Sequence, residues 1–411
     1  MKTDYDIFIL GGGLAGISMA LSLAHIDNQQ ALRIAVLEKI PFDTDQPSSF
    51  DDRCIALSAG SKQIYQSMDL WDKLNHNNQP VTEPIKDILI CEQGKFGFAR
   101  LNYQQEKVDA LGYVVESHAL GKVLLEQAQQ HKNIDIFCPV EIKQIDISLQ
   151  SVSLQFIQKQ ITNKKKLSTL SASLVIAADG NQSIAHQFLE VAPSSKAYLQ
   201  SAIITNIETE YPHQGQAFER FTEAGPLAIL PLTKNRCSLV WTIKEKQLDQ
   251  VMSLTDQDFL QQLQQHFGYR LGKIQRIGKR FAYPLILKSL DTDSAAQLQR
   301  LVFVGNAAHS IHPVTGQGFN LGLRDIQCLS ELIKTNLNQH QGKFVYQQDL
   351  VKNYWHNREK DIRNVTRFTD GLIQVFSNNT FPITPIRNLS LSLFELYQPL
   401  KTLLARFAMG L

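Results

Sequence analysis

The stretch DIFILGGGLAGISMALSLA, residues 6–24, decides the fold of this 411-residue chain. It begins with a continuous apolar run typical of a central parallel strand, turns through a cluster of glycines and continues as an apolar helix. LRIAVLEK, residues 32–39, follows as a second strand. These three segments make a βαβ unit, so the sequence predicts an α/β fold that opens with a Rossmann-like domain.

The glycine turn carries the spacing of a dinucleotide-binding loop. Gly11 suits a tight turn, Gly13 a close approach of the backbone to a pyrophosphate, and Gly16 close packing of helix on strand. The helix start offers free amides to the phosphates. Glu38, 22 residues after Gly16, ends the second strand, where a carboxylate accepts from ribose hydroxyls and repels a 2′-phosphate. This unit predicts a bound dinucleotide, either NAD or FAD.

The middle of the chain changes from this pattern to alternating strands. Residues 110–131 predict a helix and IDIFC, residues 134–138, a strand. VSLQFI (152–157) and LSASLVIAADG (170–180) predict a hairpin. LAILPL (227–232), RCSLVWTI (236–243) and RFAYPL (280–285) then indicate an antiparallel sheet, followed by C-terminal helices. We expect a nucleotide-binding domain at 1–75, 100–184 and 286–340, an interleaved substrate domain at 76–99 and 185–285, and a helical region at 341–411.

Composition narrows the class of protein. A net charge of +2 without a clustered basic excess argues against nucleic-acid binding. The cysteines are far apart and form no CxxC pair, which predicts reduced thiols in a cytoplasmic protein and no structural zinc. They are Cys54, Cys91, Cys138, Cys237 and Cys328. Neither a signal peptide nor an apolar run of about 20 residues, the length of a membrane span, is expected.

A second glycine-rich strand-to-helix turn distinguishes FAD from NAD. In VFVGNAAHSIHPVTGQGFNLG, residues 302–322, Asn306 would approach a ribityl chain, and the segment from Pro313 through Gly316 to Gly318 would deliver amides at a helix start. A helix N-terminus stabilises negative charge on a reduced flavin, whereas nicotinamide gains positive charge on oxidation. The spacing therefore favours FAD, with Asn320 in the first helical turn as a further cofactor contact.

Two other positions are candidate cofactor contacts. Arg53, in the turn of DDRCIALSAGS (51–61), would reach a phosphate or the flavin, although an exposed surface arginine fits equally well. Asp179 ends the predicted strand in VIAADGNQS (175–183), where a simple turn is the alternative.

The three motifs, in this order over nearly the whole chain, resemble those of the single-component flavoprotein aromatic hydroxylases of the p-hydroxybenzoate hydroxylase type. FDDRCIALSAGS, AFERFTEAGPLAILPL, RCSLVW and GNAAHSIHPVTGQGFNLGLRD are similar to the ubiquinone-biosynthesis hydroxylases, above all to the 2-polyprenyl-6-methoxyphenol hydroxylase type. The chain departs from the wider superfamily at Asn306, where most members have Asp, and at His186, where the DGxxSxxR pattern ends in Arg.

This resemblance implies an FAD-dependent monooxygenase. NADPH or NADH reduces FAD, the reduced flavin reacts with O2, and the ring of a polyprenylated phenol is hydroxylated, with 2-polyprenyl-6-methoxyphenol as the expected substrate. Hydroxylation of another ring position in the same pathway is the alternative. A nicotinamide-dependent dehydrogenase and a non-catalytic flavoprotein scaffold are the readings from other classes.

No catalytic side chain and no metal site are assigned from the sequence. His309 and His312 suit structural roles. Glu219 and Arg220 predict a salt-bridged pair on the sheet, the alternative being a carboxylate that faces the active site.

A hydrophobic, polyprenylated substrate implies that the protein contacts the inner membrane or other ubiquinone-biosynthesis proteins. In residues 384–411 leucines recur at near-helical spacing beside Arg387, Lys401 and Arg406. They form either a docking surface or a face packed on the FAD domain. The apolar residues are Leu389, Leu393, Leu396, Leu400, Leu403, Leu404 and Phe407.

Overall fold

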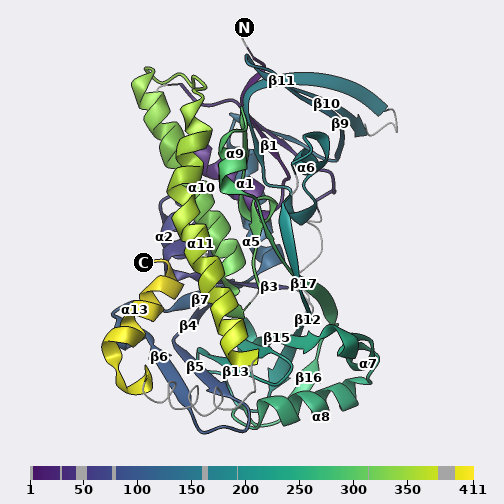
Figure 1. Cartoon of the computed structure of the whole chain (residues 1–411), viewed down its shortest axis with the longest axis vertical. Coiled ribbons are helices and arrows are strands. Elements are labelled where there is room, and N and C mark those ends of the chain that lie inside the picture. Colours follow the sequence, from purple (N-terminus) through teal and green to yellow (C-terminus); the bar gives the residue numbers. More distant parts are fainter. Residues whose placement is uncertain are drawn as a thin grey trace.

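Three β-sheets and a set of long helices make up the chain in a computed structural model (Figure 1). The structure describes residues 3–27, 30–42, 53–75, 80–159, 165–191, 193–312, 314–377 and 394–411. A seven-stranded sheet and a nine-stranded sheet lie toward opposite ends of the molecule, and a three-stranded sheet lies between them (Figure 1).

The seven-stranded sheet contains the predicted βαβ unit. Its strand order is β8-β2-β1-β11-β10-β9, and β18 pairs with β11. The pairs β8–β2, β2–β1, β1–β11 and β11–β18 are parallel, while β9, β10 and β11 form an antiparallel hairpin arrangement. The bounds are β1 Tyr5–Leu10, β2 Ile34–Leu37, β8 Ile134–Phe137, β9 Val140–Ile147, β10 Val152–Lys159, β11 Lys165–Ala177 and β18 Leu301–Phe303.

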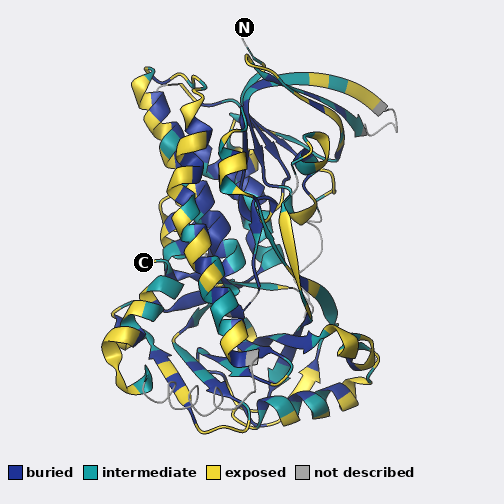
Figure 2. Ribbon diagram, in the orientation of Figure 1, coloured by how far each residue is buried: buried dark blue, intermediate teal, exposed yellow. Residues whose placement is uncertain are grey.

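Helices α1 (Leu14–Ala24) and α5 (Ser117–Gln130) pack on this sheet, and both α5 and α10 (Gln317–Gln339) pack on α1. Ile7, Phe8, Ile9 and Leu10 of β1 are all fully buried, as a continuous apolar run in a covered parallel strand requires. Figure 2 shows the same burial along the strands and along the inner face of α10. The predicted Rossmann-like unit is confirmed.

One element was predicted wrongly. The helix expected over residues 110–131 begins only at Ser117, because Gly112–Glu116 forms strand β7. All five residues of β7 are buried, and the strand pairs with β3 (Cys54–Ser58) and β4 (Thr82–Ile85) in the three-stranded sheet. A short run with two adjacent valines favours a strand once partners are available on both sides.

The nine-stranded sheet is the predicted antiparallel layer. Its order is β19-β17-β12-β15-β14-β13-β5-β6, with β16 beside β12, and only β13–β5 is parallel. One face packs under α8 (Asp256–Phe267) through buried residues that include Trp241, Phe259 and Phe267. The bounds are β5 Asp87–Glu92, β6 Phe98–Asn102, β12 Ser194–Thr209, β13 Gln216–Phe221, β14 Pro226–Leu232, β15 Arg236–Lys244, β16 Ile274–Ile277, β17 Phe281–Ser289 and β19 His309–Ser310.

Helix α11 (Asp349–Ser377) runs alongside α10 and extends from the seven-stranded to the nine-stranded sheet (Figure 1). Helix α13 (Gln398–Met409) lies near the C-terminus, beside α4. No helix within the described ranges is long and apolar enough to cross a membrane. The domain boundaries given above remain a prediction.

The remaining helices are short. They are α2 Ala59–Gln66, α3 Trp71–Leu74, α4 Tyr103–Glu106, α6 Ile184–Phe188, α7 Leu248–Met252 and α9 Thr292–Ala296. The 3₁₀ turns are η2 Gly180–Gln182, η3 Thr233–Asn235, η4 Glu245–Gln247, η5 Gly305–Ala307 and η6 Val314–Gly316.

Candidate functional site

The first glycine loop joins β1 to α1, and its shape depends on the absence of side chains. Gly11 has φ +96°, and a Cβ there would lie 2.7 Å from the Cα of Asp179. A Cβ on Gly16 would lie 1.9 Å from the backbone oxygen of Gly11. Both contacts are too short for any larger residue, so Gly11 makes the turn and Gly16 lets α1 approach the strand.

Gly13 differs from these two glycines because it faces open space. No atom of the described residues lies within 4 Å of the position that its Cβ would take. A hollow of about 200 Å³ adjoins the loop and is lined in part by Gly12, Gly13, Phe42 and Lys122. The start of α1 therefore leaves room for a group to approach its amides.

Glu38 lies beside this loop at the end of β2. Its Oε2 accepts a hydrogen bond from the Gly12 amide at 2.5 Å, and its Oε1 accepts one from Ile40 at 2.7 Å. A Cβ on Gly12 would lie 2.9 Å from the Cβ of Glu38, so the loop and the carboxylate are in direct contact. The structure thus brings the predicted acidic residue to the predicted loop.

Asp179 follows β11 on the other side of the same turn. Its Oδ2 accepts from the Ile184 amide at 2.7 Å, while its buried Oδ1 has no hydrogen-bond partner among the described residues. Burial raises the pKa of Asp179 above its ordinary value. An unpartnered buried carboxylate oxygen next to a nucleotide-binding loop fits a polar group of a ligand.

His186 connects this segment to the second glycine loop. Its Nε2 lies 2.8 Å from the carbonyl oxygen of Ala307 and its Nδ1 lies 2.9 Å from that of Val191. The ring stacks on Phe303 with centroids 4.6 Å apart. His186 therefore holds the segment after β11 to the second glycine loop.

The second loop meets the first through their helices. A Cβ on Gly305, which has φ +58°, would lie 3.6 Å from the Cβ of Ala15 in α1, and a Cβ on Gly322 in α10 would lie 3.1 Å from the Cα of Gly305. The hydroxyls of Ser22 and Ser330 are hydrogen-bonded at 2.7 Å between the same two helices. Both glycine loops thus converge at the carboxyl edge of β1, β11 and β18, the usual ligand-binding edge of such sheets.

The other residues predicted from the second loop are distributed along it. Asn306 is exposed, and Gly316 and Gly318 are partly exposed at the start of α10. Pro313 lies outside the described residues. Asn320 is buried and uses its side chain within the protein: Oδ1 accepts from the Ser58 amide at 2.9 Å and from Ser61 Oγ at 2.7 Å, and Nδ2 donates to the carbonyls of Ala56 and Gly316 at 2.9 Å. Asn320 therefore ties α10 to the β3–α2 turn.

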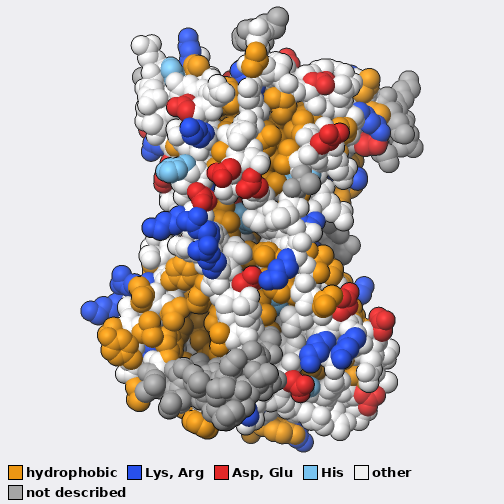
Figure 3. Space-filling model, in the orientation of Figure 1, with side chains coloured by type: hydrophobic (Ala, Val, Ile, Leu, Met, Phe, Trp, Pro, Cys, Tyr) orange, Lys and Arg blue, Asp and Glu red, His pale blue; other side chains and the backbone are white. Residues whose placement is uncertain are grey.

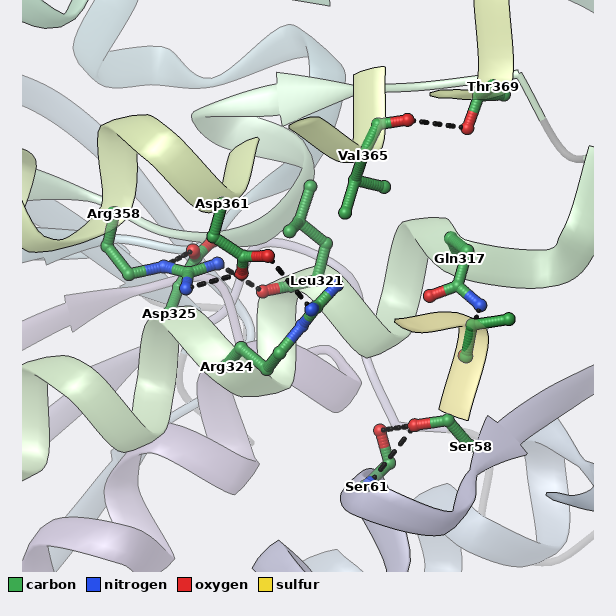
Figure 4. A network of polar contacts seen from close by, with 11 residues as sticks. Ser58, Ser61, Gln317, Leu321, Arg324, Asp325, Arg358, Asp361, Val365 and Thr369 are labelled. Carbon is green, nitrogen blue, oxygen red and sulfur yellow. Dashed lines mark hydrogen bonds and ion pairs between the residues drawn. The ribbon is translucent and has the colours of Figure 1, made fainter. Parts of the chain in front are cut away.

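A buried ionic network supports the second loop from behind (Figure 4). Asp325 of α10 accepts from the Gly305 amide at 2.9 Å and contacts His309 Nε2 at 2.7 Å through Oδ2, while its Oδ1 accepts from Arg358 Nε at 2.8 Å. Figure 4 shows Arg358 of α11 between Asp325 and Asp361, with Arg324 also directed at Asp361. Burial alone would raise the pKa of Asp325, but His309 and Arg358 outweigh it and hold the pKa below its ordinary value.

His309 and His312 both take structural positions. His309 belongs to the network just described. His312 is buried, accepts from the Val314 amide at 3.1 Å through Nδ1 and contacts the ring of Tyr198 edge-on at 5.2 Å. Burial lowers the pKa of His312 to about 4, so the ring is neutral at neutral pH.

The three-stranded sheet and the residue before it contact the nine-stranded sheet. Arg53 is exposed, its Nη1 donates to the Tyr283 hydroxyl at 3.2 Å, and its guanidinium lies 5.6 Å from the centre of that ring. Cys54 Sγ lies 3.8 Å from Asn206 Oδ1. Glu116, at the end of β7, forms a buried ion pair with Arg236 at 2.5 Å.

The salt bridge predicted between Glu219 and Arg220 is wrong. Adjacent residues of a strand point to opposite faces. Arg220 Nη1 donates to the carbonyl of Phe267 at 2.8 Å on the α8 side, and no ion pair of Glu219 occurs within the described part of the chain. Within the same residues no cluster of three or more His, Cys, Asp or Glu side chains is placed to hold a metal ion.

Comparison with known proteins assigns this fold to a family. The sequence profile of the FAD binding domain family matches residues 4–369, and the chain belongs to that family. Ubiquinone hydroxylase UbiL of Rhodospirillum rubrum is 32% identical over 98% of this chain and 89% of its own length. The 3-demethoxyubiquinol 3-hydroxylase of Escherichia coli is 29% identical over 99% of this chain and 98% of its own length.

Solved structures agree on the fold. The p-nitrophenol 4-monooxygenase PnpA of Pseudomonas putida superposes with a TM-score of 0.77 at 16% identity, over 98% of this chain and 97% of that one. Family and relatives confirm the class predicted from the sequence, an FAD-dependent monooxygenase, for which NAD(P)H is the usual reductant. The open space at Gly13 and the unpartnered Asp179 oxygen show that the residues present fit the cofactor.

Proposed function

We propose that this chain hydroxylates the ring of a polyprenylated phenol in ubiquinone biosynthesis, with 2-polyprenyl-6-methoxyphenol as its substrate. The observation that carries the proposal is the convergence of two glycine loops at one sheet edge, beside an antiparallel sheet that supplies a wall for a substrate. The relatives support the pathway, since they are ubiquinone hydroxylases. A second ring position is supported by the similarity to the 3-demethoxyubiquinol 3-hydroxylase.

We assign the adenosine end of FAD to the first glycine loop and its flavin end to the second. We assign the pyrophosphate to the α1 amides at Gly13, and the adenosine ribose to Glu38, whose carboxylate would exchange its bond with the Gly12 amide for one with a hydroxyl. Gly11 and Gly16 keep the turn narrow enough for this approach. Asp179 lies against Gly11 of the same turn, and its Oδ1 is without a partner among the described residues.

In this assignment the flavin lies at the second glycine loop. Asn306 offers an amide side chain to the ribityl region, and the α10 start at Gly316 and Gly318 offers backbone donors and the positive end of a helix dipole. Arg53 stands at the junction with the nine-stranded sheet. Bound FAD supplies the transfer of electrons from NAD(P)H to O2 and of one oxygen atom to the ring.

One assay distinguishes an enzyme from a non-catalytic flavoprotein scaffold. The FAD-loaded protein should oxidise NADPH or NADH faster when a prenylated 2-methoxyphenol is added, and product should form in proportion. A protein that binds FAD but shows no stimulation by any prenylated phenol would be the scaffold. A deletion strain identifies the ring position, because the intermediate that accumulates is the substrate.

Gly318→Leu is expected to reduce hydroxylation strongly without unfolding the protein. The Cβ position lies 3.9 Å from Ile311 Cγ1, so the protein tolerates its first atom, while the rest of the side chain would extend over the loop assigned to the flavin. We expect kcat to fall by about a hundredfold or more, the scale on which a misplaced reacting group affects turnover. Turnover near the wild-type rate in a folded, FAD-loaded variant would show that this loop does not face the ring.

Helix α13 carries a surface that suits a membrane-bound substrate. Its inner side is anchored: Ala405 and Met409 are buried, and the Ala408 carbonyl accepts from Gln317 Nε2 at 2.8 Å, next to the second glycine loop. Its outer side exposes Leu400 and Leu403 by 41% and 67%, and Leu396, just before the helix, is exposed by 81%. Figure 3 shows hydrophobic side chains gathered in the region that α13 and β6 occupy in Figure 1, with basic side chains at the edge.

We propose that this outer side rests on an anionic bilayer while the inner side contacts the flavin loop. Leu389 and Leu393 of the predicted leucine pattern lie outside the described residues. The leucine pattern was interpreted either as a packed face or as a docking surface. Each interpretation applies to one side of α13, because the inner side packs and the outer side is exposed. Removal of the whole segment would also remove the Gln317 contact, so point substitutions test docking more cleanly.

The double variant Leu396→Glu, Leu403→Glu should bind vesicles containing phosphatidylglycerol far more weakly. Burying a leucine is worth about 1.5–3 kcal/mol, so each change should weaken partitioning by about tenfold or more. Leu149→Glu is the matched control, because Leu149 is 78% exposed in a turn between β9 and β10. Equal vesicle binding by all three proteins would contradict the docking surface.

A further inference from the structure

A strip of partly exposed residues crosses the nine-stranded sheet on the side away from α8. Register places Glu219 of β13 between Ile90 of β5 and Ala228 of β14. The strip continues across β15, β12 and β17 through residues paired in the same way, namely Val240, Ile204 and Phe281. All of them keep partial exposure, whereas alternate residues of β5, β13, β14, β15 and β12 are buried under α8.

Two packed regions border this strip. Two residues before Glu219, Ala217 packs with Val114 of β7 and Ala405 of α13. Two residues after it, Phe221 packs with Val314 of η6 and stacks on Phe376 of α11, with ring centroids 3.6 Å apart. Since 217, 219 and 221 share one face of the strand, Glu219 faces the space between β7 and the loop that starts α10.

Glu219 is the only ionisable side chain of the strip. Its Oε1 is buried and has no hydrogen-bond partner among the described residues. Burial alone accounts for a pKa of Glu219 raised to about 7. A carboxyl without a partner is costly inside a protein, and such groups occur where a ligand completes them.

We propose that Glu219 accepts the hydroxyl proton of the bound phenol during hydroxylation. This inference rests on the proposed function and extends it to a catalytic residue. An aromatic ring with a prenyl tail matches the apolar members of the strip, and the phenol hydroxyl is the group that an unpaired carboxylate would bind. A phenol that gives up this proton becomes electron-rich at the ring carbons that receive oxygen.

The proton transfer balances without any further reactant. The phenol O–H bond breaks, its electron pair stays on the phenol oxygen, and the proton forms an O–H bond with Glu219. No electron is gained or lost in this step. The proton returns to the same oxygen when the hydroxylated ring becomes aromatic again.

Other ionisable groups border the strip from the packed elements. Glu92 lies two residues from Ile90 on β5, paired in register with Phe221, and Arg53 lies at the far end beside Tyr283. Tyr198, His312 and Asp370 lie around Val314 and α11, where Tyr198 is hydrogen-bonded to Asp370. None of these groups is among the causes of the raised pKa of Glu219, so the titration below is assigned to Glu219 itself.

The test is a spectroscopic titration of a bound phenol, independent of turnover. The probe is 4-nitrophenol with one prenyl group beside its hydroxyl, bound to the FAD-loaded full chain and read as a difference spectrum of the phenolate. In the wild type, carboxyl and phenol share a proton, so the phenolate signal should rise in two steps with pH. In Glu219→Gln it should rise in one step, and kcat with a prenylated phenol should fall about a hundredfold while KM changes little.

Glu106→Gln is the matched control, because Glu106 is also a buried carboxyl with an unpartnered oxygen but lies in α4 against α13. It should keep the two-step titration. A single step in the wild type overturns the role of Glu219, even if Glu219→Gln loses FAD. Failure of the wild type to bind the probe at all would instead contradict the proposed function, and the inference would fall with it.

Discussion

Gly13→Val is expected to yield a folded, colourless protein. The Cβ position of Gly13 has no described atom within 4 Å, so the protein itself tolerates a side chain there. The same space is the one assigned to the pyrophosphate, and valine would fill it. We expect the flavin content of the purified variant to fall to background, measured by absorbance after removal of free FAD, with far-UV circular dichroism unchanged.

Gly371→Val is a matched control for this change. Gly371 lies in α11, and its Cβ position likewise has no described atom within 4 Å. Valine has a higher helix propensity than glycine, so this variant should keep both fold and flavin. A full flavin complement in Gly13→Val would mean that the nucleotide does not approach α1 at that residue.

Asp325→Asn is expected to lower the free energy of unfolding by about 3–5 kcal/mol, the usual cost of breaking a buried ion pair by removing one partner. Arg358 would keep Asp361 but lose its closest buried acceptor, and His309 would lose the carboxylate at 2.7 Å. Since Asp325 also accepts from the Gly305 amide, the second glycine loop should loosen and FAD should dissociate more readily.

Urea unfolding of the FAD-loaded protein measures this effect, and Glu331→Gln provides the control on the exposed side of the same helix. The control should stay within about 0.5 kcal/mol of the wild type. The pKa of Asp325 is lowered in the fold, so its contribution is complete above the ordinary value of 3.8 and is lost as pH falls further. An Asp325→Asn variant with wild-type stability at pH 7 would show that the network adds nothing to the fold.

Local sequence patterns sufficed for the elements that carry the cofactor. Glycine spacing and an apolar run predicted β1, the turn and α1, because each of these follows from residues close in sequence. The second loop and the start of α10 near Gly316 were predicted in the same way. By contrast, β7 was interpreted as part of a helix, because five residues carry too little pattern without the partners β3 and β4.

Local sequence patterns could not predict which residues support the site. Asp325 and Arg358 are 33 residues apart and meet only because α10 and α11 pack side by side. Asp325 is the last residue of NLGLRD, but nothing local indicated that its carboxylate would contact both the Gly305 amide and the His309 ring. Sequence alone favours a salt bridge of Glu219 with Arg220 over an inward-facing Glu219, but adjacent residues of a strand point to opposite faces.

The most direct test of the central claim is the fate of labelled oxygen. The FAD-loaded protein is given NADPH or NADH, a prenylated 2-methoxyphenol and ¹⁸O2, and the product is examined by mass spectrometry. The account predicts one ¹⁸O atom on the ring for each nicotinamide oxidised in coupled turnover. A product whose new oxygen comes from water, or consumption of nicotinamide that yields only hydrogen peroxide with every prenylated phenol supplied, would contradict it.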